Sequence, residues 1–227
     1  MSKKKVYFSK YVNAEKIILE PNITSRYKND EEEKKHRYSM TIPFLGREDG
    51  GQAVVILKNP SKAGKLDEDN RKLSDDTIYK VLDYLYKHEN NYAKVTILNL
   101  FSIYGPVFKN IATKIEKVEE LSVDKNQEVL SNIIKSYNPQ KDVIILAWGG
   151  YPDLNDKKMK EKIGENKKAE IKKFYKRRIN EVEEMLKDIT VYKVGKLTGD
   201  GFPAHGKSWY DYEALTIYEP KNSEIKK

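Results

Sequence analysis

Residues 53–61 read AVVILKNPS, a continuous apolar run that ends in the polar motif Lys58-Asn59-Pro60-Ser61. Five consecutive apolar residues without alternation are typical of a strand covered on both faces of a sheet. Three further runs are also apolar and also end at a polar or Gly/Pro-rich motif: VTIL at 95–98, VIIL at 143–146 and ITVYKV at 189–194. Helical segments separate the runs, so we predict βαβ units and a mainly parallel central sheet.

Three helical segments are expected between or after these strands. The first begins near Ser74-Asp75, where a side-chain oxygen can cap the free amides, and its apolar residues recur at helical spacing from Ile78 to Leu85. The second spans about 124–137, and the third spans 157–187, either continuous or broken near Gly164. Because right-handed crossovers place such helices on both faces of a sheet, we expect a three-layer α/β/α sandwich.

The length of 227 residues predicts a single domain over residues 1–220. We expect this domain to have an N-terminal embellishment, a basic helical insertion and a disordered tail, which are residues 1–45, 157–187 and 221–227 respectively. Additional strands are expected within 5–20, at 37–42 and at 212–218, and a charged loop at 26–36.

The composition narrows the chemistry. Lys and Arg number 43 against 35 Asp and Glu, a formal net charge of +8, which favours an anionic partner, with nucleic acid ahead of a membrane surface. The charges are mixed along the chain, so a solvated Lys/Glu-rich surface explains the same balance. The absence of cysteine excludes disulfides, thiolate catalysis and Cys-ligated zinc.

Further expectations follow from what the sequence lacks. Of the three histidines, His36 and His88 lie in charged surroundings typical of a surface, so we expect neither a metal site nor a cofactor. No apolar stretch approaches the roughly 20 residues that span a bilayer, so we expect no contact with a membrane. We expect a cytoplasmic protein, and a monomer.

Each apolar run is followed by residues suited to a binding site. These motifs, in chain order, are Asn59-Pro60-Ser61, Asn99-Leu100-Phe101, Ala147-Trp148-Gly149-Gly150 and, after a Gly-rich loop, Phe202-Pro203-Ala204-His205. Open parallel sheets bind ligands just beyond the carboxyl ends of their strands. The sequence therefore predicts one pocket built from these four motifs.

One match is rejected. Residues 201–208, GFPAHGKS, fit the phosphate-cradling pattern G-x-x-x-x-G-K-[ST], which requires a strand directly before it and a helix directly after. Here a Gly-rich stretch precedes the match and the aromatic, strand-like residues 209–212 follow it. We interpret the match as a coincidence, although Lys207 and Ser208 can still contact a phosphate of DNA.

An ordered set of short motifs resembles a bacterial and phage family that is catalogued as domain of unknown function 1643 and has no settled activity. The set comprises Arg37-Tyr38, Asn59-Pro60-Ser61, Asp75-Asp76-x-Ile78, Asn99-Leu100-Phe101, Ala147-Trp148-Gly149 and Leu197-Thr198-x-x-Gly201-x-Pro203-x-His205. The resemblance extends from about residue 37 to 210. Each motif alone is weak, whereas six in order are fairly specific.

The same pattern resembles the uracil-DNA glycosylase superfamily. Asn59-Pro60 is similar to its water-positioning Asn-Pro-Gly motif, and Asn99 is similar to the Asn that reads the base edge. Ala147-Trp148-Gly149 is similar to its Leu-Trp-Gly strand end, and Ala204-His205-Gly206 to the His-Pro-Ser loop whose His supports the leaving base. Gly206 thus stands where that loop has Pro.

This resemblance implies cleavage of an N-glycosidic bond in DNA, without a cofactor. The reaction places positive charge on the sugar and negative charge on the departing base, so it needs a donor for the base and a placed water. His205 is the expected donor, and Asn59 would hold the water. Asp76 is a third catalytic candidate, since Asp75 is better explained as a helix cap.

The expected partner is DNA that carries a modified or foreign base, flipped into the pocket. The residues expected to contact this base are Asn99, Phe101, Trp148, Gly149, Pro60 and Ser61, with Tyr104 as an alternative to Phe101 for stacking. Those expected to contact phosphates are Lys62, Lys207, Ser208, Lys173 and Arg177.

Simpler interpretations stay open for several of these residues. Asn59-Pro60 is also typical of a turn, Asn99 can satisfy loop backbone, and Trp148 can belong to the core. Two other functions also stay open. One is a nucleic-acid or nucleotide-binding module that has lost catalysis, and the other is an enzyme acting on free nucleosides or nucleotides.

Overall fold

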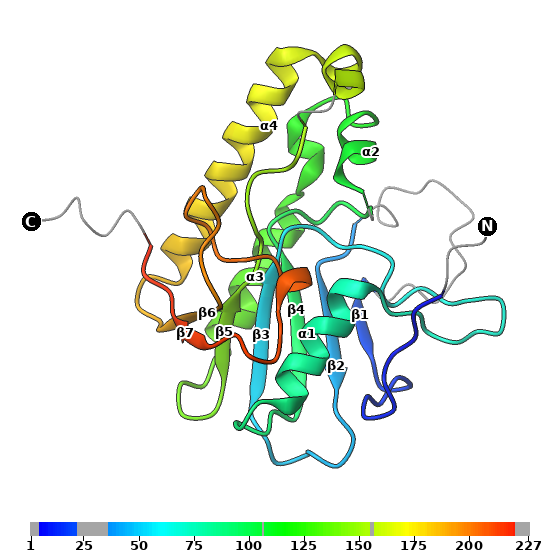
Figure 1. Ribbon diagram of the computed structural model, residues 1–227, viewed down its shortest axis with the longest axis vertical. Helices are drawn as coiled ribbons and strands as arrows, with labels where there is room; N and C mark the ends of the chain where they lie inside the picture. Colours follow the sequence, from blue (N-terminus) through cyan, green and yellow to red (C-terminus); the bar gives the residue numbers. More distant parts are fainter. Residues whose placement is uncertain (1–4, 22–35, 106, 155–156, 221–227) are drawn as a thin grey trace, which may run out of the picture.

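The computed structural model describes residues 5–21, 36–105, 107–154 and 157–220, which form one mixed sheet with helices on both of its faces (Figure 1). The strands are β1 (Ile18–Glu20), β2 (Ser39–Pro43), β3 (Gln52–Leu57), β4 (Lys94–Asn99), β5 (Val143–Leu146), β6 (Val191–Val194) and β7 (Leu215–Ile217). The helices are α1 (Asp76–Lys87), α2 (Phe108–Ala112), α3 (Asp124–Lys135) and α4 (Lys157–Met185), with short 3₁₀ helices η2 (Val118–Leu121) and η3 (Gly206–Ser208).

The strand order is β1-β2-β4-β3-β5-β6-β7. The four central strands, β4, β3, β5 and β6, are parallel, as predicted from the apolar runs. The outer strands β1, β2 and β7 pair in antiparallel fashion. Consequently β2 begins at the edge of the sheet where the parallel strands end, and its first residues join the motifs predicted to form the pocket.

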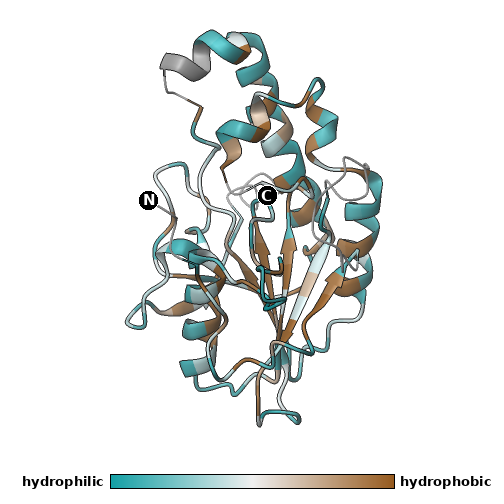
Figure 2. Cartoon of the chain, turned by 90° about the vertical axis from the view of Figure 1, so that its right-hand side faces the viewer, coloured by the Kyte–Doolittle hydropathy of each residue, from teal (hydrophilic) through white to brown (hydrophobic). Residues whose placement is uncertain are grey.

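The apolar runs are buried on both faces of the sheet. Val54 and Ile56 pack into a hydrophobic cluster with residues of α3 and α4, whereas Val55 and Leu57 pack into a second cluster with α1. Figure 2 shows the same layers as hydrophobic strands between helices whose outer surfaces are hydrophilic. The predicted α/β/α layering is therefore confirmed.

Helix α4 corresponds to the third predicted helix. It contains the break predicted near Gly164, where the backbone φ is +71°. Its Lys and Arg residues do not all face solvent. Arg178 is 6% exposed, and its guanidinium donates to the carbonyl of Leu100 and to Gln127 Oε1. This buried arginine ties α4 to the loop that follows β4.

The predictions for the N-terminal region and the last strand are only partly correct. Within residues 5–20 the only regular strand of the described chain is β1, and isolated bridges at Tyr7 and Val12 attach the rest. The last strand is shorter than expected, at Leu215–Ile217. His36 is buried, not at the surface as predicted, and its Nδ1 lies 2.8 Å from Ser102 Oγ. Residues 26–35 of the expected charged loop and the expected disordered tail 221–227 lie outside the described residues.

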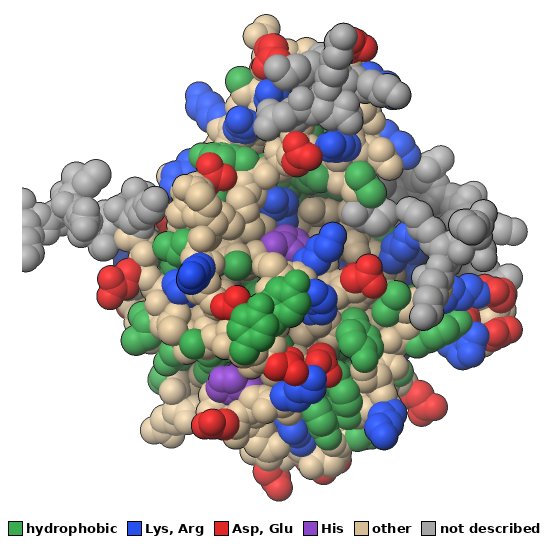
Figure 3. Space-filling model, viewed as in Figure 1, with side chains coloured by type: hydrophobic (Ala, Val, Ile, Leu, Met, Phe, Trp, Pro, Cys, Tyr) green, Lys and Arg blue, Asp and Glu red, His purple; other side chains and the backbone are tan. Residues whose placement is uncertain are grey.

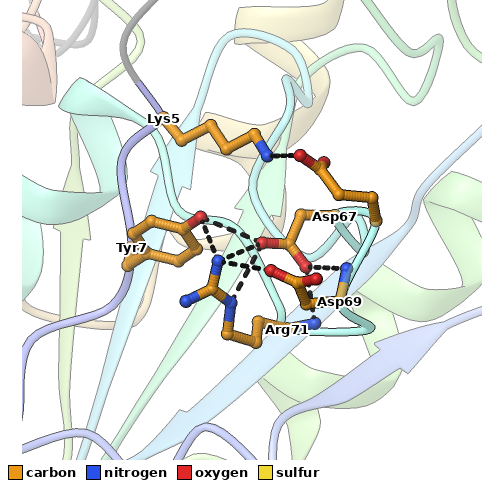
Figure 4. A network of polar contacts seen from close by, with 6 residues as sticks. Lys5, Tyr7, Asp67, Asp69 and Arg71 are labelled. Atoms are coloured by element: carbon orange, nitrogen blue, oxygen red, sulfur yellow. Dashed lines mark hydrogen bonds and ion pairs between the residues drawn. The ribbon is translucent and has the colours of Figure 1, made fainter.

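The polar loop between β3 and α1 is held to the N-terminal segment by a network around Asp67 (Figure 4). The Asp67 side chain is fully buried and accepts hydrogen bonds from Tyr7 Oη, the Arg71 side chain and backbone amides of the loop. Burial alone would raise the pKa of Asp67, but these hydrogen bonds outweigh it and lower the pKa to about 2. The network therefore fixes the loop that follows Asn59.

Replacing Asp67 by Asn is expected to lower the melting temperature at neutral pH. Because the carboxylate pKa falls from its ordinary 3.8 to about 2 on folding, its stabilising effect is present above about pH 4 and is lost as the pH falls towards 2. The gap between wild type and Asp67→Asn in melting experiments should narrow over that range. Asp69→Asn is the matched control, since Asp69 is 64% exposed, and an equal loss there would contradict this role of Asp67.

Candidate active site

The candidate site lies at the carboxyl edge of the four parallel strands. Along the chain, β3 is followed by β4 on one side of it and then by β5 on the other, so the strand order reverses at β3. Ligands of open α/β sheets bind in the crevice at such a reversal. In Figure 1, η3 and the start of α1 lie at this edge.

A cavity of about 100 Å³ opens here, at a hollow of the surface bordered by a histidine and Lys or Arg side chains (Figure 3). Its lining residues come from five segments of the chain: Arg37, Leu57, Asn59, Ser61, Asp75, Thr77, Ile78, Gly105 and His205. Three predicted site residues, Asn59, Ser61 and His205, thus meet at one cavity. Pro60 is not among the lining residues, although its carbonyl accepts a hydrogen bond from Asn59 Nδ2.

The Asn59 amide is held in one orientation. Its Nδ2 donates to the carbonyl of Gly105 at 2.8 Å and to that of Pro60 at 3.2 Å. The loops after β3 and β4 are further joined by backbone hydrogen bonds such as Phe101 N to Lys58 O. With its N–H groups used in this way, Asn59 offers its Oδ1 atom as an acceptor for a bound molecule.

Asp75 is a helix cap, as the sequence indicated. Its Oδ1 accepts from the backbone amides of Thr77 and Ile78, and its Oδ2 accepts from Ser61 Oγ. The carboxylate therefore joins α1 to the Asn59 loop at the cavity wall. Asp76 is exposed in the first turn of α1 and does not line the cavity, so the structure does not bring this catalytic candidate to Asn59 and His205.

His205 is a neutral hydrogen-bond donor in this cavity. Burial, and then the positive charges of Lys58 and Lys207, lower the pKa of its imidazole to about 4. Its Nδ1 accepts the backbone N–H of Lys207 at 3.1 Å, so the single proton of the neutral ring is on Nε2. At pH 7 the side chain can therefore donate one hydrogen bond through Nε2 without carrying charge.

Two glycines hold the His205 loop in place. Gly149 has a φ of +73°, and a Cβ there would lie 2.9 Å from the Cβ of His205. Its amide also donates to the carbonyl of Pro203 at 3.0 Å. A Cβ at Gly206 would lie 2.6 Å from Val81 on α1, which explains why this position is glycine. Gly149, which was predicted to contact the base, does not line the cavity and instead lies directly against His205.

Two cations of the site, Arg37 and Lys58, were not predicted from the sequence. Arg37 is 3% exposed, lines the cavity and donates to the carbonyl of Ala63. Lys58 donates to the carbonyl of Gly150 at 2.5 Å, and burial lowers the pKa of its amine to about 8. Only the positions of these two residues in the chain could have indicated a role. Arg37 precedes the antiparallel β2, and Lys58 follows β3 at the same edge of the sheet.

Five of the six predicted base-binding residues do not line the cavity: Pro60, Asn99, Phe101, Trp148 and Gly149. Phe101 and Trp148 belong to the hydrophobic cluster on the α4 side, where Phe101 stacks on Phe174. Asn99 is completely buried, on the same face of the sheet as Leu57 in the neighbouring strand, and within the described chain neither atom of its amide has a hydrogen-bond partner.

The predicted phosphate contacts divide into two groups. Lys207 is exposed beside His205, and Ser208 Oγ donates to the His205 carbonyl, so both lie near the cavity together with Lys62 of the Asn59 loop. Lys173 and Arg177 are exposed on α4 and line a separate groove of about 1090 Å³. The P-loop match has neither of the neighbours that the pattern requires, since β6 ends at Val194, before a loop, and the match itself ends in the three-residue η3 with no α-helix after it in the described chain.

Within the described residues there is no cluster of His, Asp and Glu that would hold a metal, and no helix there is long and apolar enough to cross a membrane.

Comparisons with known proteins identify a family. A search of curated proteins and a search of solved structures each returned no match. The model of a family described as a protein of unknown function (DUF1643) matches residues 37–206. As its motifs predicted, the chain therefore belongs to the DUF1643 family.

Proposed function

We propose that the protein is a DNA glycosylase-like hydrolase with the fold of the uracil-DNA glycosylases that its motifs resemble. It would cleave the N-glycosidic bond of a modified or foreign base. The observation that carries this proposal is the pairing of His205, half-buried and neutral with its proton on Nε2, with the fixed Asn59 amide in one small cavity.

The two side chains supply what bond cleavage requires. His205 donates from Nε2 to an oxygen of the base and stabilises the negative charge that develops there. Asn59 Oδ1 accepts from a water and aligns it with the sugar carbon. As the water oxygen bonds to C1′, the C1′–N bond breaks and its electron pair leaves with the base. The base then takes up a proton, and solvent takes the proton that the water loses.

The size of the cavity supports a single flat ring as its occupant. A volume of about 100 Å³ is well below the roughly 300–1,000 Å³ of pockets for drug-sized ligands. The sugar and phosphates would therefore stay outside, near Lys62 and Lys207.

A second candidate function is nucleic-acid or nucleotide binding without catalysis. The buried Arg37 and the Lys58 amine favour it, because cations beside the cavity suit a phosphate as well as a departing base. This alternative predicts DNA binding that weakens steeply with salt and releases no base.

The proposal is tested by mass spectrometry of bases released from DNA. Substrates are single-stranded and duplex oligonucleotides with uracil, hypoxanthine, or hydroxymethyl- or glucosyl-pyrimidines, together with genomic DNA of modified phages. We expect release of one base class and a loss of about 10²-fold or more in Asn59→Ala, which has no acceptor for the water. Asp76→Asn is the matched control outside the cavity. No released base from any substrate, by protein of native melting temperature, would refute the proposal.

A further inference from the structure

Exposed tyrosines form a patch beside the cavity. Tyr212 is 81% exposed, the highest value among the large hydrophobic side chains of the described chain, and Tyr210 and Tyr79 are 48% and 42% exposed. The rings of Tyr210 and Tyr212 are parallel within 4°, with centroids 5.5 Å apart. We call these three residues the tyrosine patch. Large exposed aromatic surfaces of this kind mark binding sites.

The patch and the cavity are built on the same two segments. Ile78 of α1 lines the cavity and Tyr79 follows it, whereas His205 lines the cavity and Tyr210 follows it after η3. Packing of Trp209 against Tyr84 of α1, with ring centroids 5.3 Å apart, fixes one segment on the other. In Figure 3 hydrophobic and Lys or Arg side chains gather over α1 and η3, next to the hollow.

The charges around the patch suit a polyanion. The Lys80 amine lies 4.6 Å from the centroid of the Tyr210 ring. Lys207 is exposed, and in the sequence it lies between His205 of the cavity and Tyr210 of the patch. Lys87 forms ion pairs of 2.7 Å with both nearby acids, Asp211 and Asp83. Aromatic faces next to free lysines are the combination that binds the bases and phosphates of a single strand.

We propose that the tyrosine patch is a stacking platform for bases of single-stranded nucleic acid, next to the nucleotide at the cavity. The proposal rests on the proposed function for the nature of the substrate, and it adds the preferred strand state. In a duplex both faces of a base are covered by its neighbours, whereas the bases of a single strand can stack on the open face of Tyr212. The preferred substrate is therefore single-stranded.

Fluorescence anisotropy tests this without any base release. The probes are a short labelled oligothymidine, the same sugar-phosphate chain without bases, and the duplex with oligoadenine. We expect the oligothymidine to bind most tightly and Tyr212→Ala to weaken its binding roughly tenfold. Tyr212→Phe should keep the affinity because it keeps the ring. Ile217→Ala, at a site 58% exposed on β7, is the matched control and should have no effect.

Several outcomes would overturn the platform. They are unchanged affinity of Tyr212→Ala, equal weakening for the chain without bases, duplex binding as tight as single-strand binding, or sedimentation that shows a dimer dissociated by Tyr212→Ala. Because the readout is affinity, a failed base-release screen refutes only the proposed hydrolysis. The stacking result stands or falls separately.

Discussion

Replacing His205 by alanine is expected to lower the rate of base release by about 10²–10³-fold, because the site loses the donor that meets the departing base. His205→Gln keeps an N–H donor on a side chain of similar reach and should retain part of the rate. Single-turnover release of the base, followed by mass spectrometry, gives the measurement. Melting curves of both variants check that the fold persists.

The pH profile of the same reaction separates a donor role from a structural one. His205 is neutral above its pKa of about 4, and Lys58, whose charge assists the departing base, is an ammonium below its pKa of about 8. Below pH 4 a second proton goes on Nδ1, which can then no longer accept the Lys207 N–H that orients the ring. The rate should therefore rise through pH 4, stay level and fall above pH 8, and His205→Gln should lose the acidic limb. A rate that titrates near 6.5, the ordinary pKa of imidazole, would contradict a half-buried neutral donor.

The meeting of Asn59 and His205 was predictable because it depends on few facts. Unbroken apolar runs indicate parallel strands, and the carboxyl ends of parallel strands share one edge. Asn59 directly follows such a run and therefore lies at that edge, whereas His205 reaches it through the loop that follows β6. The cap at Asp75 was predictable for a similar reason, since it depends only on local residues.

The direction of side chains at the strand ends was not predictable. Along β5, Ile145 and Ala147 pack on the α1 side, and Leu146 and Trp148 pack on the α4 side. A strand that is apolar on both faces shows no alternation in sequence, so nothing indicated that Trp148 points away from the cavity. Arg37 was missed because only the antiparallel direction of β2, a tertiary feature, brings it to this edge.

Gly149→Ala is expected to destabilise the protein by about 2–5 kcal/mol and to lower base release with it. The left-handed backbone at φ +73° costs an L-residue roughly 1–2 kcal/mol. The new Cβ, 2.9 Å from the Cβ of His205, adds the cost of overpacking, about 1–3 kcal/mol, or displaces the His205 loop. Denaturant unfolding and the base-release rate measure the two effects.

Gly46→Ala is the control that separates strain from contact, because Gly46 has nearly the same φ, +70°, and nothing within 4 Å of an added Cβ. It should cost only the strain, about 1–2 kcal/mol. In a His205→Gly background, which removes the opposing Cβ, the cost of Gly149→Ala should fall to the cost of Gly46→Ala. Backbone strain at position 149 is the same whether or not His205 has a side chain. Only the contact between the two positions can respond to the double replacement, so equal costs in both backgrounds would mean that Gly149 does not hold His205 in place.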